Sequence, residues 1–260
     1  AVTVTPVNDN TPAITSSATA NVAENTTAVM TVTATDADLP AQTLSYSIVG
    51  GADAAKFAIN STTGTLSFVT APNYESPTDA GGNNVYDVTV QVSDGTLTST
   101  QAIAVTVTPV NDNTPTITSS ATASVAENTT AVLTVTATDA DLPAQTLTYS
   151  IVGGADAAKF SINASTGALS FVTVPDYEAP TDSGGNNVYD VTVQVSDGAL
   201  TSTQAIAVTV TPVNDNTPAI TSSATASVAE NTSAVMTVTA TDADLPAQTL
   251  SYSIVGGADA

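Results

Sequence analysis

The chain has 260 residues and is strongly acidic, with 24 Asp and Glu against two Lys and Arg, and a formal net charge of −22. This charge excludes a basic footprint for nucleic acid and argues against docking on anionic lipid. Cys and His are absent, which removes disulfides, thiolate and imidazole metal ligands, and Cys or Ser–His nucleophile systems. A metal bound here must therefore prefer oxygen, and cations are the expected partners.

A long internal repeat organises the sequence. Val-Asn-Asp-Asn-Thr-Pro begins at residues 7, 110 and 213, and Val-Ala-Glu-Asn begins at 22, 125 and 228, which fixes a period of 103. Such a period predicts tandem structural units. We expect the last strand and linker of a preceding repeat at 1–12, complete repeats at 13–115 and 116–218, and the first part of a further repeat at 219–260.

Apolar and polar residues alternate through 116–218, which is typical of half-buried strands. The positions expected to face inward are, in chain order, Leu133, Val135 and Ala137, then Leu147, Tyr149 and Ile151, then Phe160 and Ile162, then Leu169 and Phe171, then Tyr189, Val191, Val193 and Val195, and finally Ile206, Val208 and Val210. The segment 163–167 ends in Gly and predicts a hairpin turn. About seven strands in roughly 100 residues predict an all-β fold of tandem seven-stranded, immunoglobulin-like Greek-key β-sandwiches.

Acidic residues gather at the predicted strand ends and turns. In the second repeat they are Glu127, Asp139, Asp141, Asp176, Glu178 and Asp197, followed by the linker Asn214-Asp215-Asn216. These carboxylates would repel one another unless a cation neutralised them, and Ca²⁺ accepts roughly six to eight oxygen ligands in flexible geometry. We expect three other acidic residues to lie at the surface: Asp156, Asp182 and Asp190. We expect the aliphatic parts of the Lys56 and Lys159 side chains to lie over a sheet edge.

The order of these motifs resembles the calcium motifs of the cadherin family. Glu-Asn stands near the start of each repeat, Asp-x-Asp follows the second predicted strand, Asp-x-Glu lies in the middle, and Asn-Asp-Asn-x-Pro closes the repeat. The match covers the whole period. The segments Pro-Thr-Asp-x-Gly-Gly-Asn-Asn-Val-Tyr and Val-Thr-Pro-Val-Asn-Asp-Asn resemble cadherin-like repeats of large bacterial surface proteins and adhesins more closely than they resemble animal cadherins.

The resemblance implies Ca²⁺ ions between successive repeats, with ligands from both repeats and from the linker. The first full junction would use Glu24, Asn73, Glu75, Asn111, Asp112, Asn113, Asp139, Asp141 and Asp197. The next junction would use Glu127, Asp176, Glu178, Asn214, Asp215, Asn216, Asp242 and Asp244. An incomplete junction at the start leaves Asn8, Asp9, Asn10, Asp36, Asp38 and Asp94.

Two departures from the family pattern affect the expected number of ions. Pro109 and Pro212 stand two residues before Asn-Asp-Asn, where the family usually has an acidic residue, and Asn73 stands where the second repeat has Asp176. We therefore expect about two or three Ca²⁺ ions per junction, with fewer at the first. Trp is absent, so the Trp-anchored strand exchange of classical animal cadherins is not available.

The resemblance and the repeats together predict a Ca²⁺-rigidified stalk or filament segment of a large, secreted or cell-surface adhesin-type protein. It would act as a spacer in a linear rod and in cell adhesion, with calcium and the neighbouring repeats as partners. The alternative is a repeated carbohydrate-binding or homophilic module, including a glycosylated fibre, since triplets such as Asn25-Thr26-Thr27 fit the glycan acceptor pattern. Like chains and surface glycans are further partners under that alternative.

No enzymatic activity is expected, because no nucleophile stands with its base in the repeats. No run of about 18 apolar residues is present, so no membrane span is visible in this stretch.

Overall fold

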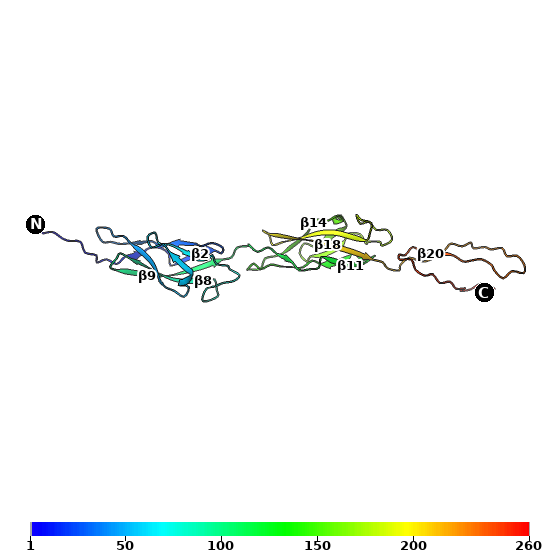
Figure 1. Ribbon diagram of the computed structural model, residues 1–260, viewed down its shortest axis with the longest axis horizontal. Coiled ribbons are helices and arrows are strands. Elements are labelled where there is room, and N and C mark those ends of the chain that lie inside the picture. The colour runs from blue at the N-terminus through cyan, green and yellow to red at the C-terminus, as the bar shows by residue number, and fades with distance from the viewer. Residues whose placement is uncertain (1, 260) are drawn as a thin grey trace. The chain divides into compact units, whose positions relative to one another are not determined.

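The computed structural model describes residues 2–259. Contacts divide the chain into two compact units, one formed by Ala1–Asn113 with Ala140–Gln145 and the other by Thr114–Asp139 with Thr146–Ala260. Each unit contains one β-sandwich, marked in Figure 1 by strands β2, β8 and β9 in the first unit and by β11, β14 and β18 in the second.

The first sandwich has a four-stranded sheet in the order β2-β9-β8-β5, a three-stranded sheet in the order β3-β7-β6, and the short pair β1-β4. Strand β2 runs parallel to β9, and the other pairs are antiparallel. The elements are β1 Ala13–Ile14, β2 Thr19–Ala23, β3 Ala28–Thr31, β4 Ala34–Thr35, β5 Ser45–Gly50, the 3₁₀ turn η1 Ala54–Lys56, β6 Phe57–Ile59, β7 Thr65–Phe68, β8 Val85–Ser93 and β9 Thr98–Thr108.

The second sandwich repeats this topology, with sheets β11-β18-β17-β14 and β12-β16-β15 and the pair β10-β13. Its elements are β10 Thr116–Ile117, β11 Thr122–Ala126, β12 Ala131–Thr134, β13 Ala137–Thr138, β14 Thr148–Gly153, the 3₁₀ turn η2 Ala157–Lys159, β15 Phe160–Ile162, β16 Ala168–Phe171, β17 Val188–Ser196 and β18 Thr201–Thr211. The predicted all-β sandwich fold is confirmed.

Alternation along β17 and β18 builds the core of the second sandwich, because every second side chain of a strand faces the opposite sheet. The buried rows include Tyr189, Val191, Val193, Ile206 and Val208, and the half-buried Leu133, Tyr149, Ile151 and Ile162 pack against them. Phe160 stacks on Phe171 with ring centroids 4.6 Å apart, and Tyr189 meets Phe171 edge-on at 5.1 Å. These rows match the inward-facing positions that the sequence predicts.

The predicted turn at 163–167 is a hairpin joining β15 to β16. The side-chain Oδ1 of Asn163 accepts the backbone N–H groups of Ser165 and Thr166 at 3.0 Å each. Gly167 has φ +71°, and a Cβ placed there would lie 2.2 Å from the carbonyl oxygen of Val135. Only glycine fits this close approach without moving the backbone at Val135, which lies between β12 and β13.

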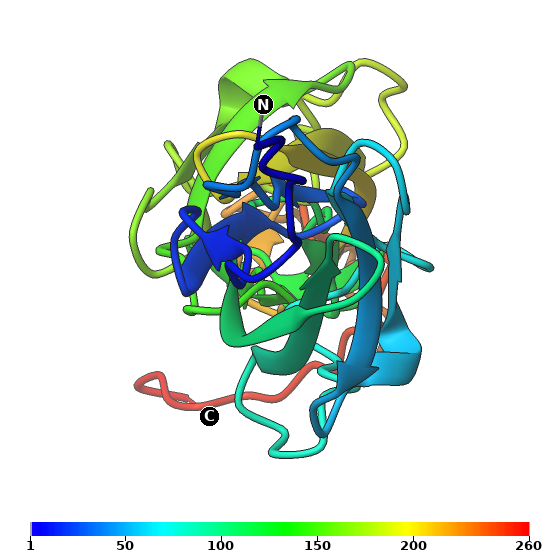
Figure 2. The ribbon, with the colours of Figure 1, turned by 90° about the vertical axis from the view of Figure 1, so that its left-hand side faces the viewer.

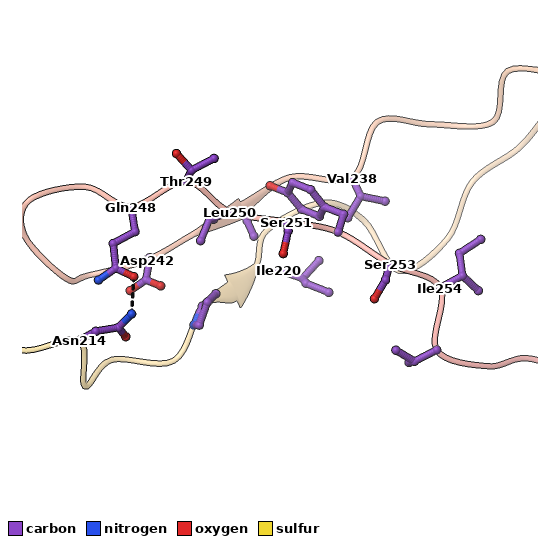
Figure 3. A pocket seen from close by; sticks show the side chains of 14 residues that line it. Asn214, Ile220, Val238, Asp242, Gln248, Thr249, Leu250, Ser251, Ser253 and Ile254 are labelled. Carbon is purple, nitrogen blue, oxygen red and sulfur yellow. Dashed lines mark hydrogen bonds between the residues drawn. The ribbon is translucent and has the colours of Figure 1, made fainter.

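Residues 219–260 correspond in sequence to 13–54 and form only β19 (Ala219–Ile220) and β20 (Ala240–Thr241) among the described residues. Side chains that the complete sandwiches bury are exposed here: Val238 is 44% exposed, whereas Val32 and Val135 are 1% exposed. The resulting hollow has a volume of about 720 Å³. Figure 3 shows side chains that line it, among them Ile220, Val238 and Ile254. The hollow is the uncovered inner face of this segment, so we assign no ligand to it.

The interpretation of Asp156 and Asp182 as surface residues is wrong. Asp156 is 5% exposed and Asp182 is 7% exposed. Asp182 accepts the backbone N–H groups of Asn186 and Asn187 at 2.9 and 3.0 Å, and Asp156 accepts those of Ser183 and Asp190 at 2.6 and 2.9 Å. The two carboxylates therefore anchor the loop between β16 and β17, while the side chain of Asp190 is exposed as predicted.

The same anchor exists in the first repeat, where Asp79 accepts the N–H groups of Asn83 and Asn84. Burial raises the pKa of Asp79, but these backbone donors outweigh it and hold the pKa below its ordinary value. Asp182 behaves in the same way with Asn186 and Asn187 as donors. Because the folded-state pKa is depressed, the carboxylates stabilise the fold above the pKa of the unfolded chain, and this stability is lost as the pH falls through the folded pKa.

We expect the pair Asp79→Asn and Asp182→Asn to lower the free energy of unfolding by about 1–3 kcal/mol per repeat at neutral pH, since backbone donors lose a charged acceptor. The difference from the wild type should shrink as the pH falls below about 4. Urea denaturation in a chelating buffer measures both effects. The exposed pair Asp87→Asn and Asp190→Asn removes the same charge and should change little, and an equal loss in both pairs would contradict the anchor role.

Candidate functional site

Three carboxylates meet at one end of the first sandwich, and we call them the N-terminal cluster: Asp36, Asp38 and Asp94. Asp36 directly follows β4 and Asp94 directly follows β8. Each residue offers a carboxylate oxygen, and these oxygens lie within 4.8 Å of one another. Figure 2 views the first unit from the end at which the N-terminus lies. Like charges this close are stable only with a counter-charge or with many hydrogen-bond donors.

Backbone and amide donors hold the N-terminal cluster in place. Asp38 is buried and accepts the backbone N–H of Asn10 at 3.1 Å and its side-chain amide at 2.5 Å. The Asn10 side-chain amide is the main cause that lowers the pKa of Asp38, against burial, which raises it. Asp36 Oδ1 accepts the N–H of Asp38 at 2.9 Å.

Asp94 is held by its own turn. Its Oδ1 accepts the backbone N–H groups of Thr96 and Leu97 at 2.7 Å each. Burial raises the pKa of Asp94, but the N–H groups of Leu97 and Thr96 and the amide of Asn8 lower it further than burial raises it. The lowered pKa values of Asp38 and Asp94 keep these two carboxylates ionised at neutral pH.

The opposite end of the first sandwich carries a second set, the C-terminal cluster: Glu24, Glu75 and Asp112, whose oxygens also lie within 4.8 Å of one another. Glu24 follows β2 and is 1% exposed. Its Oε1 accepts the N–H of Val110 in the linker, and its Oε2 accepts the N–H of Tyr74, both at 2.7 Å. One buried carboxylate thus ties the linker to the Asp-x-Glu-type loop.

Local backbone shape completes the C-terminal cluster. Asn25 has φ +60°, a left-handed conformation that Asn tolerates better than most residues, and its amide donates to Asp112. Glu75 Oε1 accepts the N–H of Leu142 at 3.1 Å, within the 140–145 segment that belongs to the first unit. Asn73 Oδ1 accepts the N–H of Ser76 at 2.8 Å, so this oxygen is used in a local turn.

The second unit has a related cluster, in which Glu127 and Glu178 are the counterparts of Glu24 and Glu75, and Asp176 is the third carboxylate in place of the counterpart of Asp112. Glu127, Asp176 and Glu178 bring their oxygens within 4.8 Å of one another. Glu127 accepts the N–H groups of Val213 and Tyr177 at 2.7 Å each, the same distances as Glu24. Glu178 accepts the N–H of Leu245 at 2.9 Å, and Asp176 accepts that of Ala179 at 2.9 Å.

The remaining predicted ligands lie in the linkers and in the Asp-x-Asp turns. In the first unit the Asn113 amide donates to Asp141 at 2.6 Å, and Asn10 donates to Asp9 at 3.2 Å. In the second unit an oxygen of Asp139 lies within 4.8 Å of one of Asp197, and Asp215 accepts the Asn128 amide at 2.5 Å. In the same unit the Asn216 amide donates to Asp244 at 2.8 Å, and Asp242 accepts the N–H of Asp244 at 3.2 Å. The side-chain amide of Asn214 donates to Gln248. Asn111, in the first unit, is half-buried.

Burial raises the pKa of Asp141 and Asp244, but the side-chain amides of Asn113 and Asn216 and nearby backbone donors bring each pKa below its ordinary value. Both carboxylates therefore stay ionised at neutral pH.

The donor chemistry of the first unit fits a hard cation. Asn8 Oδ1, Asp36 Oδ2 and Glu75 Oε2 are buried, and no hydrogen-bond donor reaches them among the described residues. Lys56 and Lys159 are the only cationic side chains of the chain, and they lie in η1 and η2 rather than in the clusters. Buried oxygens without donors are costly unless something else satisfies them, and Ca²⁺ is the ion that such carboxylate and amide oxygens suit.

The sequence comparisons agree with this architecture. Residues 18–108 and 121–211 each match the cadherin domain. The chain therefore belongs to the cadherin domain family.

Human protocadherin Fat 1 is 34% identical over 277 residues, covering 98% of this chain and 6% of that protein. Chitinase A of Pseudoalteromonas piscicida is 37% identical over 124 residues, covering 47% of this chain and 14% of that protein. The structure of mouse cadherin-23 EC22-24 has a TM-score of 0.65 at 25% identity, covering 91% of this chain and 79% of that structure. The chain thus spans only a small part of the curated relatives it matches.

No helix among residues 2–259 has the length and apolar character needed to cross a membrane.

One set of polar residues at these turns was missed at the level of sequence. Gln42, Gln145 and Gln248 each follow the second Asp of Asp-x-Asp by four residues. The available signal was that these glutamines recur in every repeat. A neutral amide four residues after an acidic motif does not by itself indicate a contact with that motif. The structure shows contacts of Gln248 with both the linker and Asp244.

We expect the pair Glu24→Gln and Glu127→Gln to destabilise the calcium-free protein by about 1–3 kcal/mol per repeat, because each buried carboxylate accepts two backbone N–H groups and an amide NH₂ cannot accept. Urea denaturation in excess chelator gives the free energy of unfolding. The matched pair Glu75→Gln and Glu178→Gln touches one backbone donor each and should lose less. Equal losses in the two pairs would show that the double acceptor role of Glu24 and Glu127 is not what holds the linker.

Proposed function

We propose that this chain is a Ca²⁺-rigidified extracellular segment of a large cell-surface adhesin-type protein, in which 13–115 and 116–218 are repeating spacers. Calcium would bind at the linkers between repeats, about two or three ions at each. The ligands would be the acidic and Asn residues of the clusters, the linkers and the Asp-x-Asp turns. The parent protein would use the segment as a stalk or filament in cell adhesion.

The observation that carries this proposal is the pair of carboxylate clusters at the two ends of one sandwich. Their carboxylates are held by backbone and side-chain amide donors, and both lysines of the chain lie elsewhere. Three of them, Asp36, Glu75 and Asp94, keep a buried oxygen without a donor among the described residues. An external cation is the simplest group that satisfies these oxygens and reduces the repulsion. The match of each repeat to the cadherin domain supports calcium as that cation.

Rigidity would follow from the way the linker is held. Glu24 accepts from Val110 in the linker, and Asp38 accepts from Asn10 in the preceding linker. An ion bound to these carboxylates would add ligands from the same linker and restrict its backbone. Without the ion, self-repulsion among the acidic groups would favour bending.

A bacterial surface protein is the proposed source of the segment. The sequence of the repeats supports a bacterial source. The match to a stretch of the Pseudoalteromonas piscicida protein shows that similar sequence occurs outside animals. We propose no catalysis for this segment, since no nucleophile stands with its base in the repeats.

A repeated binding module is the second candidate function, because a groove recurs in both repeats. It has a volume of about 570 Å³ beside Lys56 and about 350 Å³ beside Lys159. The aromatic rings lining it, such as Tyr86, are almost fully buried, so they offer little of the exposed face on which sugars stack. Binding of the chain to a glycan array that disappears with Lys56→Ala and Lys159→Ala would favour this candidate over the spacer.

Small-angle X-ray scattering of the chain with calcium and with excess chelator tests the proposal. We expect a larger maximum dimension and a narrower range of conformations in calcium, and a rise in melting temperature that is half-complete at about 0.1–1 mM, the range of extracellular calcium modules. Unchanged scattering and an unchanged melting temperature would reject the proposal.

The pair Glu75→Gln and Glu178→Gln removes one carboxylate from the C-terminal cluster of the first sandwich and one from the group Glu127, Asp176 and Glu178 of the second, and should weaken the calcium response. The exposed pair Asp87→Asn and Asp190→Asn removes the same net charge and should leave it intact. If both pairs weakened the response equally, overall charge rather than the clusters would explain it.

A further inference from the structure

Five Asn-x-Ser/Thr triplets occur in the sequence, and the structure divides them into two kinds. This triplet is the acceptor pattern for N-linked sugar. The first kind directly follows the Glu of Val-Ala-Glu-Asn, and the second lies in the hairpin after β6 or β15. The acceptor asparagines are Asn25, Asn128 and Asn231 in the first kind, and Asn60 and Asn163 in the second.

The first kind has its amide nitrogen engaged in both complete repeats. The Asn25 amide donates to Asp112, and the Asn128 amide donates to Asp215 at 2.5 Å. A glycosyltransferase would have to break this contact with the linker before it could bind the nitrogen. The first kind is therefore a poor acceptor as long as the linker carboxylate holds the amide.

The second kind leaves its amide nitrogen free. Asn60 and Asn163 are exposed in the turns that join β6 to β7 and β15 to β16. Asn60 Oδ1 accepts the backbone N–H groups of Thr62 and Thr63 at 3.0 Å each, and the equivalent bonds of Asn163 have the same length. Among residues 2–259 no acceptor is bonded to Nδ2 of either asparagine. The turn thus uses the oxygen of the amide and spares the nitrogen.

The hydroxyl group that completes the triplet is also available. Thr62 and Ser165 are exposed, and their hydroxyl groups form no hydrogen bond within the part of the chain that the structure describes. A transferase that recognises Asn-x-Ser/Thr can therefore contact both ends of the triplet without unfolding the hairpin.

The bonded oxygen also favours reaction at the nitrogen. Two N–H donors on Oδ1 stabilise negative charge there, so they ease the loss of a proton from Nδ2. In the transfer, Nδ2 forms a bond to the anomeric carbon of a sugar that is esterified to phosphate. The C–O bond to the phosphate breaks, the phosphate leaves with the electron pair, and one Nδ2 proton passes to a base of the transferase.

We propose that Asn60 and Asn163 carry N-linked sugar, attached by a transferase that recognises Asn-x-Ser/Thr, and that Asn25 and Asn128 do not. The two acceptors are equivalent positions of the 103-residue repeat, so each complete repeat would display one sugar chain at the same hairpin. The sites lie outside the carboxylate clusters, and the inference does not depend on calcium.

Peptide mass spectrometry of the protein isolated from the cells that make it tests the proposal. Chymotrypsin cleaves after the two phenylalanines that flank each hairpin, which gives the short peptides 58–68 and 161–171 with one site each. We expect both peptides to carry a sugar mass that electron-transfer fragmentation locates at the asparagine, and the peptides containing Asn25 and Asn128 to be unmodified. Unmodified hairpin peptides, or sugar at Asn25 or Asn128, would overturn the proposal.

Variants made in the same cells separate the acceptor pattern from the fold of the hairpin. The pair Thr62→Ala and Ser165→Ala keeps both asparagines and the backbone N–H groups of the turn, and it should lose the sugar completely. The conservative pair Thr62→Ser and Ser165→Thr keeps the pattern and should retain the sugar. Sugar that persists in the alanine pair, or that is lost from the conservative pair, would also overturn the proposal.

Discussion

Negative charge without an internal counter-charge is the constraint on which both repeats depend. Asp36, Asp38 and Asp94 crowd one end of the first sandwich and Glu24, Glu75 and Asp112 the other, while the two lysines of the chain lie in 3₁₀ turns. Burial disfavours the charges of Glu24, Asp38 and Asp94, and backbone N–H groups compensate for part of that cost. The carboxylates are therefore fixed in position by the fold, which reduces the ordering that an ion would have to impose.

The two kinds of buried carboxylate differ in how their oxygens are used. Asp79 and Asp182 give both oxygens to backbone donors of a single loop and stabilise that loop. Asp36 and Glu75 each satisfy one oxygen and leave the other buried without a donor among the described residues. A fully bonded carboxylate is a structural element, whereas a half-bonded one next to two others is suited to a cation.

The near-identity of the repeats makes this arrangement periodic. Glu24 and Glu127 accept equivalent linker and loop N–H groups at the same 2.7 Å distances. The aromatic trio of Phe57, Phe68 and Tyr86 is reproduced by Phe160, Phe171 and Tyr189 with centroid distances that agree to the tenth of an ångström. A function that depends on repeat number, such as spacing, needs this uniformity, because each unit must behave like its neighbour.

The sequence by itself determined the fold class, the rows of core residues and the groups of acidic residues, because period-two alternation and a 103-residue repeat are local and regular signals. It even placed the hairpin at 163–167, whose glycine is required by a positive φ. Only the tertiary structure decided that Asp156 and Asp182 are buried, since their donors come from residues such as Ser183 and Asn187 on a loop brought in by the β17 strand. It also decided which oxygens keep no donor and brought Gln248 against Asn214, because hydrogen-bond saturation depends on neighbours distant in sequence that no residue pattern encodes.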